Sequence, residues 1–417
     1  MKLIYSLVLS FYRLAIGVVS FFSPKAKLWI DGRKNWRAIY KTKLSGLQTQ
    51  PLWFHISSVG EFEQGKPILE EFRIKYPNIP LVLTFFSPSG FELLKNTKDA
   101  DFVFYLPLDS KANAKDFIEI INPRAAIFIK YEFWLFYFEE LHKKLIPFTL
   151  ISAKLREDQL FFKWYGKSFS RILHLPNFFF VQDKETKKLL KNIGQHNVMV
   201  SGDTRVDRVN SVLELQKELD KIETFKDEKP ILILGSAWKK ELDFIRVIIN
   251  SDLLHNWKII IAPHEINKSK IESFRKTLSK TSILYSNKSS LEELKNSKIL
   301  IIDGVGILKY TYKYCNLALI GGGFIDGIHN ILEPAAFGVP SIFGPNHFKF
   351  PEAENLLKLG GGFEVKNESE FTKIVAVLTS NSKELNKASK ACSDFITKNK
   401  GATMEIMNKL KEVLHVE

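Results

Sequence analysis

From residue 52 onward, short apolar runs alternate with segments of helical periodicity, a pattern typical of βα units whose strands form parallel sheets. The apolar runs fall into two groups, at 52–56, 80–86, 101–107, 125–130, 146–152 and 178–182, and then at 231–236, 257–263, 281–286, 298–303, 317–322 and 339–344. A Gly-poor, Lys- and Glu-rich helical stretch, 211–229, lies between the groups. The sequence therefore predicts two α/β domains of similar size, with a ligand cleft between them at the ends of the strands.

The first 23 residues form a separate apolar segment. Phe21, Phe22 and Pro24 stand where a signal peptidase would need small residues, so cleavage is not expected. Polar or small residues recur every three or four positions and share one helical stripe: Ser6, Ser10, Arg13, Gly17 and Ser20. We expect a membrane-associated helix at 1–23, which either spans the bilayer or lies in its interface. A terminal helix packed on its own domain is the alternative.

The positive charge is concentrated near this segment. The chain carries a net +14, of which residues 1–50 contribute +8, with nine Lys or Arg and one acid, Asp31. A basic block beside an apolar helix indicates an anionic membrane surface, whereas a nucleic-acid-binding protein usually spreads its basic residues over a folded face. Nucleic acid is therefore not an expected partner. The two cysteines, Cys315 and Cys392, have neither metal-ligand nor redox spacing, which favours a reducing compartment.

Two acidic residues follow predicted strands of the first domain. Glu61 lies in the turn after 52–56, where a rigidly held carboxylate can act as a general base. The alternative is a capping box in which Ser58 caps the helix with Glu61. Glu132 follows 125–130 among aromatic residues, where its carboxylate is desolvated, so it either pairs with a basic group or has a pKa shifted for catalysis. A solvated helix start is its alternative.

The second domain contains Gly-rich turns that suit a phosphorylated ligand. Gly235 and Ser236 close a strand before a helix, where free backbone N–H groups bind phosphate. In 317–352, the glycines 321–323 allow a ligand to approach the backbone, and Glu333 is placed to accept ribose hydroxyls at a helix start. The sequence lacks a P-loop, a GxSxG elbow, an HExxH motif, a CxxC pair and a DxD-type pair. A metal-independent enzyme acting on a nucleotide-activated substrate is the leading class.

Seven motifs occur in an order that resembles the 3-deoxy-D-manno-octulosonic acid (Kdo) transferases, which are GT-B glycosyltransferases of lipopolysaccharide biosynthesis. The motifs are WFHISSVGEFEQGKPILEEF, LTFFSPSGFELLK, KYEFWLF, ISAKLRE, VQDKE, SGDTRVDRV and GGGFIDGIHNILEPAAFGVPSIFGPNHFKF. The resemblance extends to about residue 365. It implies two Rossmann-like domains facing across a cleft, and transfer of Kdo from CMP-Kdo to lipid IVA on the cytoplasmic side of a Gram-negative inner membrane, with no metal and no cofactor. Anionic lipids of that membrane are the further expected partner.

The resemblance also implies a division of the chain and roles for individual residues. Residues 1–23 would be the anchor, 24–210 the acceptor-binding domain and 211–417 the CMP-Kdo-binding domain, with the last helix able to return to the N-terminal domain. Glu61 would take the proton from the acceptor's primary hydroxyl, so that a single displacement inverts the anomeric carbon. Glu132 would stabilise the transition state, although Lys130 replaces the first acid of the family's acidic pair. Arg205 would neutralise the Kdo carboxylate or the CMP phosphate.

The same resemblance assigns a set of residues to CMP: Pro263, His264, Val305, Gly306, Ile307, Asn330, Ile331, Leu332 and Glu333. Two departures from the family occur here, because relatives read Pro-Arg-His at 263–265 and Gly-Glu at 306–307. The basic aromatic segment 161–171 would meet the acceptor's acyl chains and phosphates, or form a packed helix. Another GT-B transferase that uses a UDP-sugar and a lipid acceptor remains an alternative, as does a non-enzymatic, membrane-anchored nucleotide-binding module.

Overall fold

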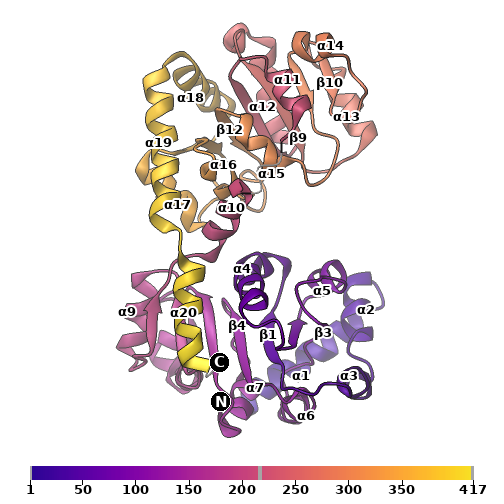
Figure 1. The fold of residues 1–417 in the computed structure, drawn as a ribbon, viewed down its shortest axis with the longest axis vertical. Helices are drawn as coiled ribbons and strands as arrows, with labels where there is room; N and C mark the ends of the chain where they lie inside the picture. The colour runs from indigo at the N-terminus through magenta and orange to yellow at the C-terminus, as the bar shows by residue number, and fades with distance from the viewer. Residues whose placement is uncertain (1, 215–217, 415–417) are drawn as a thin grey trace. The chain divides into compact units, whose positions relative to one another are not determined.

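A computed structural model describes residues 2–214 and 218–414. The chain divides into two compact units, one formed by residues up to Arg208 together with those from Lys400 onward, and the other by Val209–Asn399 (Figure 1). The division lies close to the boundary expected at residue 210. Part of the expected connector, 215–217, lies outside the described residues, and its remainder contains the end of one helix and the whole of another.

The described part of the first unit holds a seven-stranded parallel sheet in the order β3-β2-β1-β4-β5-β6-β7. Its strands are β1 Leu52–Ile56, β2 Leu81–Phe85, β3 Phe102–Tyr105, β4 Ala125–Ile129, β5 Phe148–Ala153, β6 Phe178–Val181 and β7 Val198–Val200. β1, β2, β4 and β5 are buried along their whole length, as their continuous apolar sequences require. The strand order reverses between β1 and β4, and ligands of such sheets bind beyond the carboxyl ends of the strands at this point.

Helices cover both faces of this sheet. The helices of this unit are α1 Lys2–Val19, α2 Pro24–Asp31, α3 Trp36–Leu44, α4 Val59–Lys75, α5 Pro88–Leu94, α6 Lys111–Ile121, α7 Leu135–Lys143, α8 Lys167–Ser170, α9 Lys184–Asn192 and α20 Ala402–Leu414, and α10 Thr204–Glu214 crosses the boundary between the two units. The C-terminal helix α20 packs beside α4 and β5, and its Ile406, Met407, Leu410 and Leu414 join the apolar core on that face (Figure 1).

The segment 161–171 is not the continuous packed helix considered as one reading of its sequence. It consists of the 3-10 turns η1 Leu160–Phe162 and η2 Trp164–Gly166, the single-turn helix α8, and the start of η3 Arg171–His174. Gly166 allows this compact path, because a Cβ there would lie 1.7 Å from the carbonyl oxygen of Leu160. The Trp164 side chain is left 89% exposed.

The described part of the second unit holds another seven-stranded parallel sheet, ordered β10-β11-β9-β8-β12-β13-β14, which reverses between β8 and β12. Its strands are β8 Ile231–Ala237, β9 Lys258–Pro263, β10 Ser282–Leu284, β11 Ile299–Ile301, β12 Leu317–Ile320, β13 Ser341–Phe343 and β14 Gly362–Glu364. Its helices are α11 Asp220–Lys226, α12 Lys239–Asn250, α13 Lys268–Arg275, α14 Leu291–Asn296, α15 Leu308–Thr311, α16 Leu332–Ala336, α17 Pro351–Leu359, α18 Glu368–Ser380 and α19 Ser382–Asn399, with the 3-10 turns η4 Asp252–Leu254 and η5 Tyr312–Tyr314.

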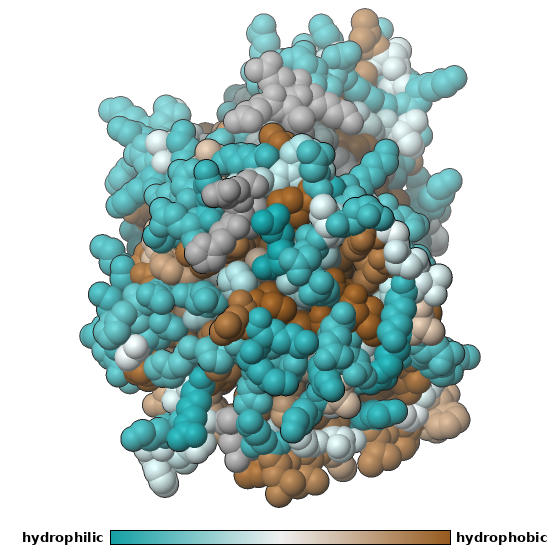
Figure 2. All heavy atoms as spheres, turned by 60° about the horizontal axis from the view of Figure 1, so that its bottom comes forward, coloured by the Kyte–Doolittle hydropathy of each residue, from teal (hydrophilic) through white to brown (hydrophobic). Residues whose placement is uncertain are grey.

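The N-terminal helix α1 is long and apolar enough to cross a membrane, with a mean hydropathy of 1.6, and none of its residues is buried. Figure 2 shows that hydrophobic surface is limited to patches on a largely hydrophilic face. Exposed apolar side chains line α1: Leu3, Ile4, Leu7, Val8, Phe11, Leu14 and Val18. Two polar contacts hold the helix to its unit: the Tyr5 hydroxyl donates to Asp109 Oδ2 at 2.6 Å, and Lys2 Nζ lies 2.9 Å from Glu139 Oε1.

Candidate active site

Glu61 lies in the first turn of α4, directly beyond the carboxyl end of β1. Ser58 is the N-cap residue, but its hydroxyl donates to Glu61 Oε2 at 2.5 Å and makes no side-chain hydrogen bond to the helix backbone. The capping-box reading of this motif is therefore wrong. The Glu61 carboxylate is half-buried and held by a short charge-assisted hydrogen bond, which fixes its orientation while leaving it accessible to a substrate.

Glu132 is 7% exposed and follows β4, the strand next to β1. Its Oε2 lies 2.8 Å from Trp134 Nε1, which donates to it, and 3.1 Å from His55 Nε2. The solvated-helix reading is therefore wrong, and the basic partner expected for a desolvated acid is His55. Within the described residues, Glu132 Oε1 makes no hydrogen bond, so one carboxylate oxygen is fixed and the other is available to a ligand.

A buried polar chain supports His55 from the strands beneath it. His55 pairs in register with Thr84 of β2, and its Nδ1 lies 2.9 Å from Thr84 Oγ1, which also accepts a hydrogen bond from Trp53 Nε1 at 2.8 Å. The Thr84 hydroxyl also donates to the Phe54 carbonyl at 3.2 Å, and the Nε2–H of His55 donates to Glu132. Trp53 and His55 share one face of β1 because side chains alternate along a strand.

The turn between β4 and Glu132 is strained. Lys130 has φ +66°, and its backbone N–H donates to the Ile151 carbonyl at 2.8 Å. Non-Gly residues adopt this conformation at a cost of about 1 kcal/mol, and such strain clusters at functional sites. The turn directs Glu132 back over the sheet.

Tyr131, next to Glu132, lies among the charged groups predicted for catalysis. Burial raises the pKa of its phenol, and the charges that act on it belong to Arg156, Asp183, Arg205 and Glu61. Glu61 and Arg205 therefore both lie within electrostatic reach of Tyr131, the sequence neighbour of Glu132. Arg205 is already paired, because its guanidinium donates to both carboxylate oxygens of Asp203, with Nη2 at 2.6 Å from Oδ2. Its charge is therefore shared with a neighbouring acid.

The second unit contains a pocket of about 280 Å³ at the carboxyl ends of its central strands. Its lining residues are Ser236, Gly306, Leu308, Lys309, Tyr312, His329, Asn330 and Glu333. Three residues predicted for CMP are therefore brought together: Gly306, Asn330 and Glu333. Ile331 and Leu332 are buried in the core, and the Val305 side chain is 91% exposed. Pro263, His264, Val305, Ile307, Ile331 and Leu332 do not line this pocket.

His264 instead belongs to an aromatic stack at the pocket wall. Its ring centroid lies 4.1 Å from that of Trp238 and 4.7 Å from that of His329. Trp238 Nε1 donates to His329 Nε2 at 3.1 Å, so that nitrogen carries no proton. Burial, and then the neighbouring His264, lower the pKa of His329, which therefore stays neutral near pH 7.

The glycines 321–323 pack against protein backbone rather than open space. A Cβ at Gly321 would lie 2.0 Å from the Ser236 carbonyl oxygen, and one at Gly323 would lie 2.5 Å from the Gly344 nitrogen. Glu241 holds the same loop, because its carboxylate accepts from the backbone N–H of Gly322 at 2.9 Å and of Trp238 at 3.1 Å. These close approaches require glycine at both positions, whether or not a ligand is present.

Sequence reasoning did not select His55, Thr84, Lys309, Tyr312 or His329. His55 and His329 both lie inside quoted motifs, directly beside predicted site residues, and this proximity was the available signal. Tyr312 carries no such signal, because its position under Gly235 depends on packing. Among the described residues, no group of three or more His, Cys, Asp or Glu side chains is placed to hold a metal ion.

The solved structures that resemble this chain share its two-sheet fold. UDP-GlcNAc 2-epimerase from Neisseria meningitidis, bound to UDP-GlcNAc, aligns with a TM-score of 0.61 at 16% identity, over 87% of this chain and 100% of that one. MurG of Acinetobacter baumannii aligns with a TM-score of 0.55 at 10% identity, over 87% and 99% of the two chains. At these identities the likeness shows the fold alone.

The sequence comparisons are more specific. Residues 34–208 match the family described as 3-Deoxy-D-manno-octulosonic-acid transferase (kdotransferase). The 3-deoxy-D-manno-octulosonic acid transferase of Aquifex aeolicus is 30% identical over 80% of this chain and 87% of its own length, and that of Haemophilus influenzae is 26% identical over 96% and 94%. The chain therefore belongs to the 3-deoxy-D-manno-octulosonic acid transferase family, glycosyltransferases with the GT-B fold.

Proposed function

We propose that this protein transfers Kdo from CMP-Kdo to lipid IVA, with inversion at the anomeric carbon and Glu61 as the general base. Family membership supports Kdo transfer, and the observation that carries the mechanism is the pair of differently held carboxylates beyond β1 and β4. Glu61 is half-buried and bonded to a hydroxyl, whereas Glu132 is buried and bonded to two ring N–H groups. Such unequal environments suit a proton acceptor and a fixed negative charge, respectively.

In the proposed step, the acceptor's primary hydroxyl oxygen attacks the anomeric carbon of Kdo. Glu61 takes the hydroxyl proton as the new C–O bond forms, and the bond from the anomeric carbon to the CMP phosphate oxygen breaks with its electron pair leaving on the phosphate. The Ser58 hydroxyl orients Glu61 for this transfer. A single displacement of this kind inverts the anomeric centre.

Positive charge develops at the anomeric carbon as the phosphate leaves. The fixed carboxylate of Glu132 stabilises that charge, because it is oriented by the protein and needs no rearrangement during the reaction. Arg205 interacts with the anionic donor through its guanidinium, which stays held by Asp203. Glu132 and Arg205 thus act on opposite charges of the same donor.

The pocket of the second unit is the proposed CMP site. Glu333 accepts a ribose hydroxyl, Asn330 orients Glu333 through its Nδ2 donor at 3.2 Å, and Lys309 supplies positive charge for the phosphate. The exposed aromatic and basic side chains of 161–171 are proposed to contact the acceptor. The helix α1 associates the enzyme with the inner membrane from the cytoplasmic side, with anionic lipids as partners and no role for nucleic acid.

Mass spectrometry of lipid IVA after incubation with the enzyme tests this function. A mass increase equal to one or more Kdo residues with CMP-Kdo, and no increase with UDP-N-acetylglucosamine, is the expected result. Transfer from the UDP-sugar alone would favour the alternative GT-B activity, and no transfer from either donor would favour a binding module. Undiminished transfer in excess EDTA is expected, because the proposal includes no metal.

A further inference from the structure

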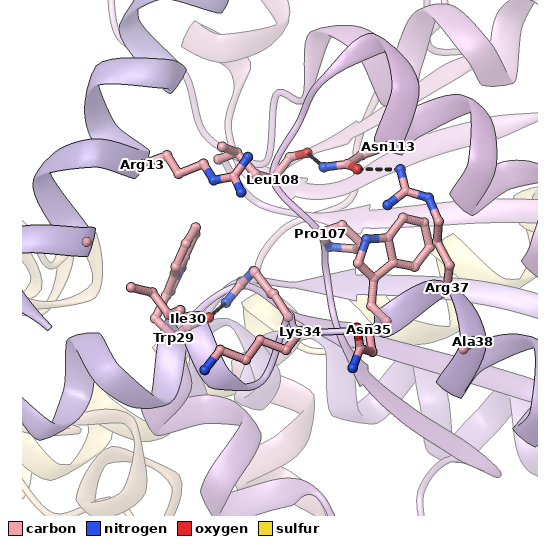
Figure 3. Close-up of a pocket in the computed structure, with 13 residues that line it drawn as sticks. Arg13, Trp29, Ile30, Lys34, Asn35, Arg37, Ala38, Pro107, Leu108 and Asn113 are labelled. Atoms are coloured by element: carbon pink, nitrogen blue, oxygen red, sulfur yellow. Dashed lines mark hydrogen bonds between the residues drawn. The ribbon is translucent and has the colours of Figure 1, made fainter.

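A cavity of about 730 Å³ lies in the first unit beside the N-terminal helix (Figure 3). Its walls come from α1, from the segment 29–38 of α2 and α3, and from residues 107–113 before and within α6. Four basic side chains line it: Arg13, Arg33, Lys34 and Arg37. In Figure 3, the Arg13 side chain extends from α1 toward Leu108, and Arg37 lies at the other side of the cavity, bonded to Asn113.

Two of these four cations lack an acidic partner within the described residues. Lys34 pairs with Asp31 at 2.8 Å and Arg37 with Asp116 at 2.6 Å. Arg13 is exposed and makes no hydrogen bond or ion pair with any described residue. The cavity therefore carries positive charge that the described acidic groups do not balance.

Arg33 is the second unbalanced cation, and its contacts are neutral. Its Nε, Nη1 and Nη2 donate to the main-chain carbonyls of Leu106, Trp29 and Phe86 at 2.8, 2.9 and 2.7 Å. Its guanidinium also lies 4.1 Å from the Trp29 ring centroid. Burial lowers the pKa of Arg33 to about 10, but the group stays charged at neutral pH. Three of its five N–H donors are used in these bonds, so two remain for a ligand.

The cavity adjoins the polar stripe of the helix α1. Arg13 and Gly17 line it, and both belong to the polar stripe of α1, whereas the exposed apolar side chains lie elsewhere on the same helix. When the apolar face enters a bilayer, the polar stripe lies near the headgroup boundary. Trp29 and Trp36 also line the cavity, and tryptophan is enriched at this boundary.

We propose that this cavity binds the phosphate of an anionic membrane lipid, whose headgroup carries no cation to offset that charge, with Arg13 and Arg33 as its direct contacts. The inference rests on the membrane association proposed above and adds a defined site to it. Guanidinium groups suit this ligand because their planar donors match phosphate oxygens. The assigned ligand is a lipid-borne phosphate, and a free phosphate ion is distinguished from it in the test.

Vesicle co-sedimentation of the full-length protein tests the proposal. The vesicles are phosphatidylcholine alone, or phosphatidylcholine with one part in five of phosphatidylglycerol. Arg13→Gln is compared with Lys27→Gln, which removes the same charge from an exposed position of α2 that does not line the cavity. A charge lost from a diffuse basic surface is worth about fivefold in binding, equivalent to about 1 kcal/mol. We expect that loss for Lys27→Gln and at least a further threefold for Arg13→Gln, on the anionic vesicles only.

A second variant separates the cavity from hydrophobic insertion. A Cβ at Gly17 meets nothing within 4 Å, so Gly17→Leu is tolerated in α1, fills the cavity from that side and makes the helix more apolar. We expect it to weaken binding to anionic vesicles without weakening binding to phosphatidylcholine. Equal losses for Arg13→Gln and Lys27→Gln, or tighter anionic binding by Gly17→Leu, would overturn the site.

Inorganic phosphate is the remaining arm of the test. If it binds the detergent-solubilised protein and Arg13→Gln abolishes that binding without changing vesicle binding, the cavity takes a free anion and the lipid assignment is wrong. Because none of these assays measures sugar transfer, failure of the site leaves the proposed function standing. If the wild-type protein binds neither kind of vesicle, the proposed membrane association is itself contradicted.

Discussion

The contact between His55 and Glu132 gives the sharpest prediction on catalysis. Replacing His55 with Leu removes the Nε2 donor that lies 3.1 Å from Glu132 Oε2 and leaves Trp134 as the remaining donor to that oxygen. A hydrogen bond to a charged group contributes about 1.5–3 kcal/mol. If Glu132 acts mainly in the transition state, this loss lowers kcat by roughly 10- to 150-fold. The KM for the donor should change little.

The assay includes a variant that restores the lost donor. In His55→Gln, the side-chain amide nitrogen reaches the position of the imidazole Nε2, so this variant should recover most of the activity that His55→Leu loses. A double-mutant cycle adds Glu132→Gln, and in that background His55→Leu should have little further effect, because both changes remove the same interaction. Near-UV circular dichroism verifies that each variant is folded.

A wild-type kcat in folded His55→Leu would contradict this role, because Glu132 would then be held without His55. A His55→Gln variant no more active than His55→Leu would also contradict it, since the hydrogen-bond donor would then be irrelevant. Additive effects in the double-mutant cycle would show that the two residues act independently.

Three further predictions concern pH, packing and the nucleotide. Burial raises the pKa of Asp109 to about 6, so between pH 4 and 6 the folded protein holds a proton that the unfolded chain has lost. Its free energy of unfolding should therefore fall as pH rises, by about 3 kcal/mol in total. Denaturant titrations of Asp109→Asn at several pH values should not show this fall. Gly235→Ala should destabilise the protein by about 1–3 kcal/mol in thermal unfolding, because the new Cβ would lie 2.1 Å from the hydroxyl oxygen of the buried Tyr312. Gly46→Ala is the control and should not destabilise the protein, because a Cβ there meets nothing within 4 Å. Calorimetry should show that Glu333→Gln weakens CMP binding while vesicle binding stays unchanged, and an unchanged CMP affinity would remove Glu333 from the site.

Most of the fold follows from local pattern, because buried parallel strands appear as apolar runs. β1 matches its predicted range, and the other predicted strands lie within a few residues of theirs. β7 and β14 were not predicted, since three-residue strands such as Val198–Val200 and Gly362–Glu364 leave too short a pattern. The packing of α20 on the first sheet depends on contacts distant in sequence, and periodicity alone does not contain that information.

The two acidic residues of the candidate site could be predicted from the sequence, but the residues that contact them could not. Glu61 and Glu132 each follow an apolar run, so their place at a strand end was visible in the sequence. That His55 and Thr84 support Glu132 depends on the pairing of β1 with β2 and β4, which composition does not reveal. The capping-box interpretation of Ser58 failed because its hydroxyl donates to Glu61 Oε2 and makes no side-chain hydrogen bond to the helix backbone. The glycines 321–323 were given a ligand role, but backbone packing explains two of them.

The role of Glu61 is tested most directly by single-turnover transfer from CMP-Kdo to lipid IVA with Glu61→Gln. The amide keeps the shape and accepts no proton, so the rate should fall at least about 100-fold, as expected for loss of a general base. Glu63→Gln is the matched control, because Glu63 is exposed on the same helix and contacts Arg208 at 3.5 Å, and it should transfer at the wild-type rate. A folded Glu61→Gln protein that binds CMP and transfers Kdo as fast as Glu63→Gln would contradict the proposed mechanism.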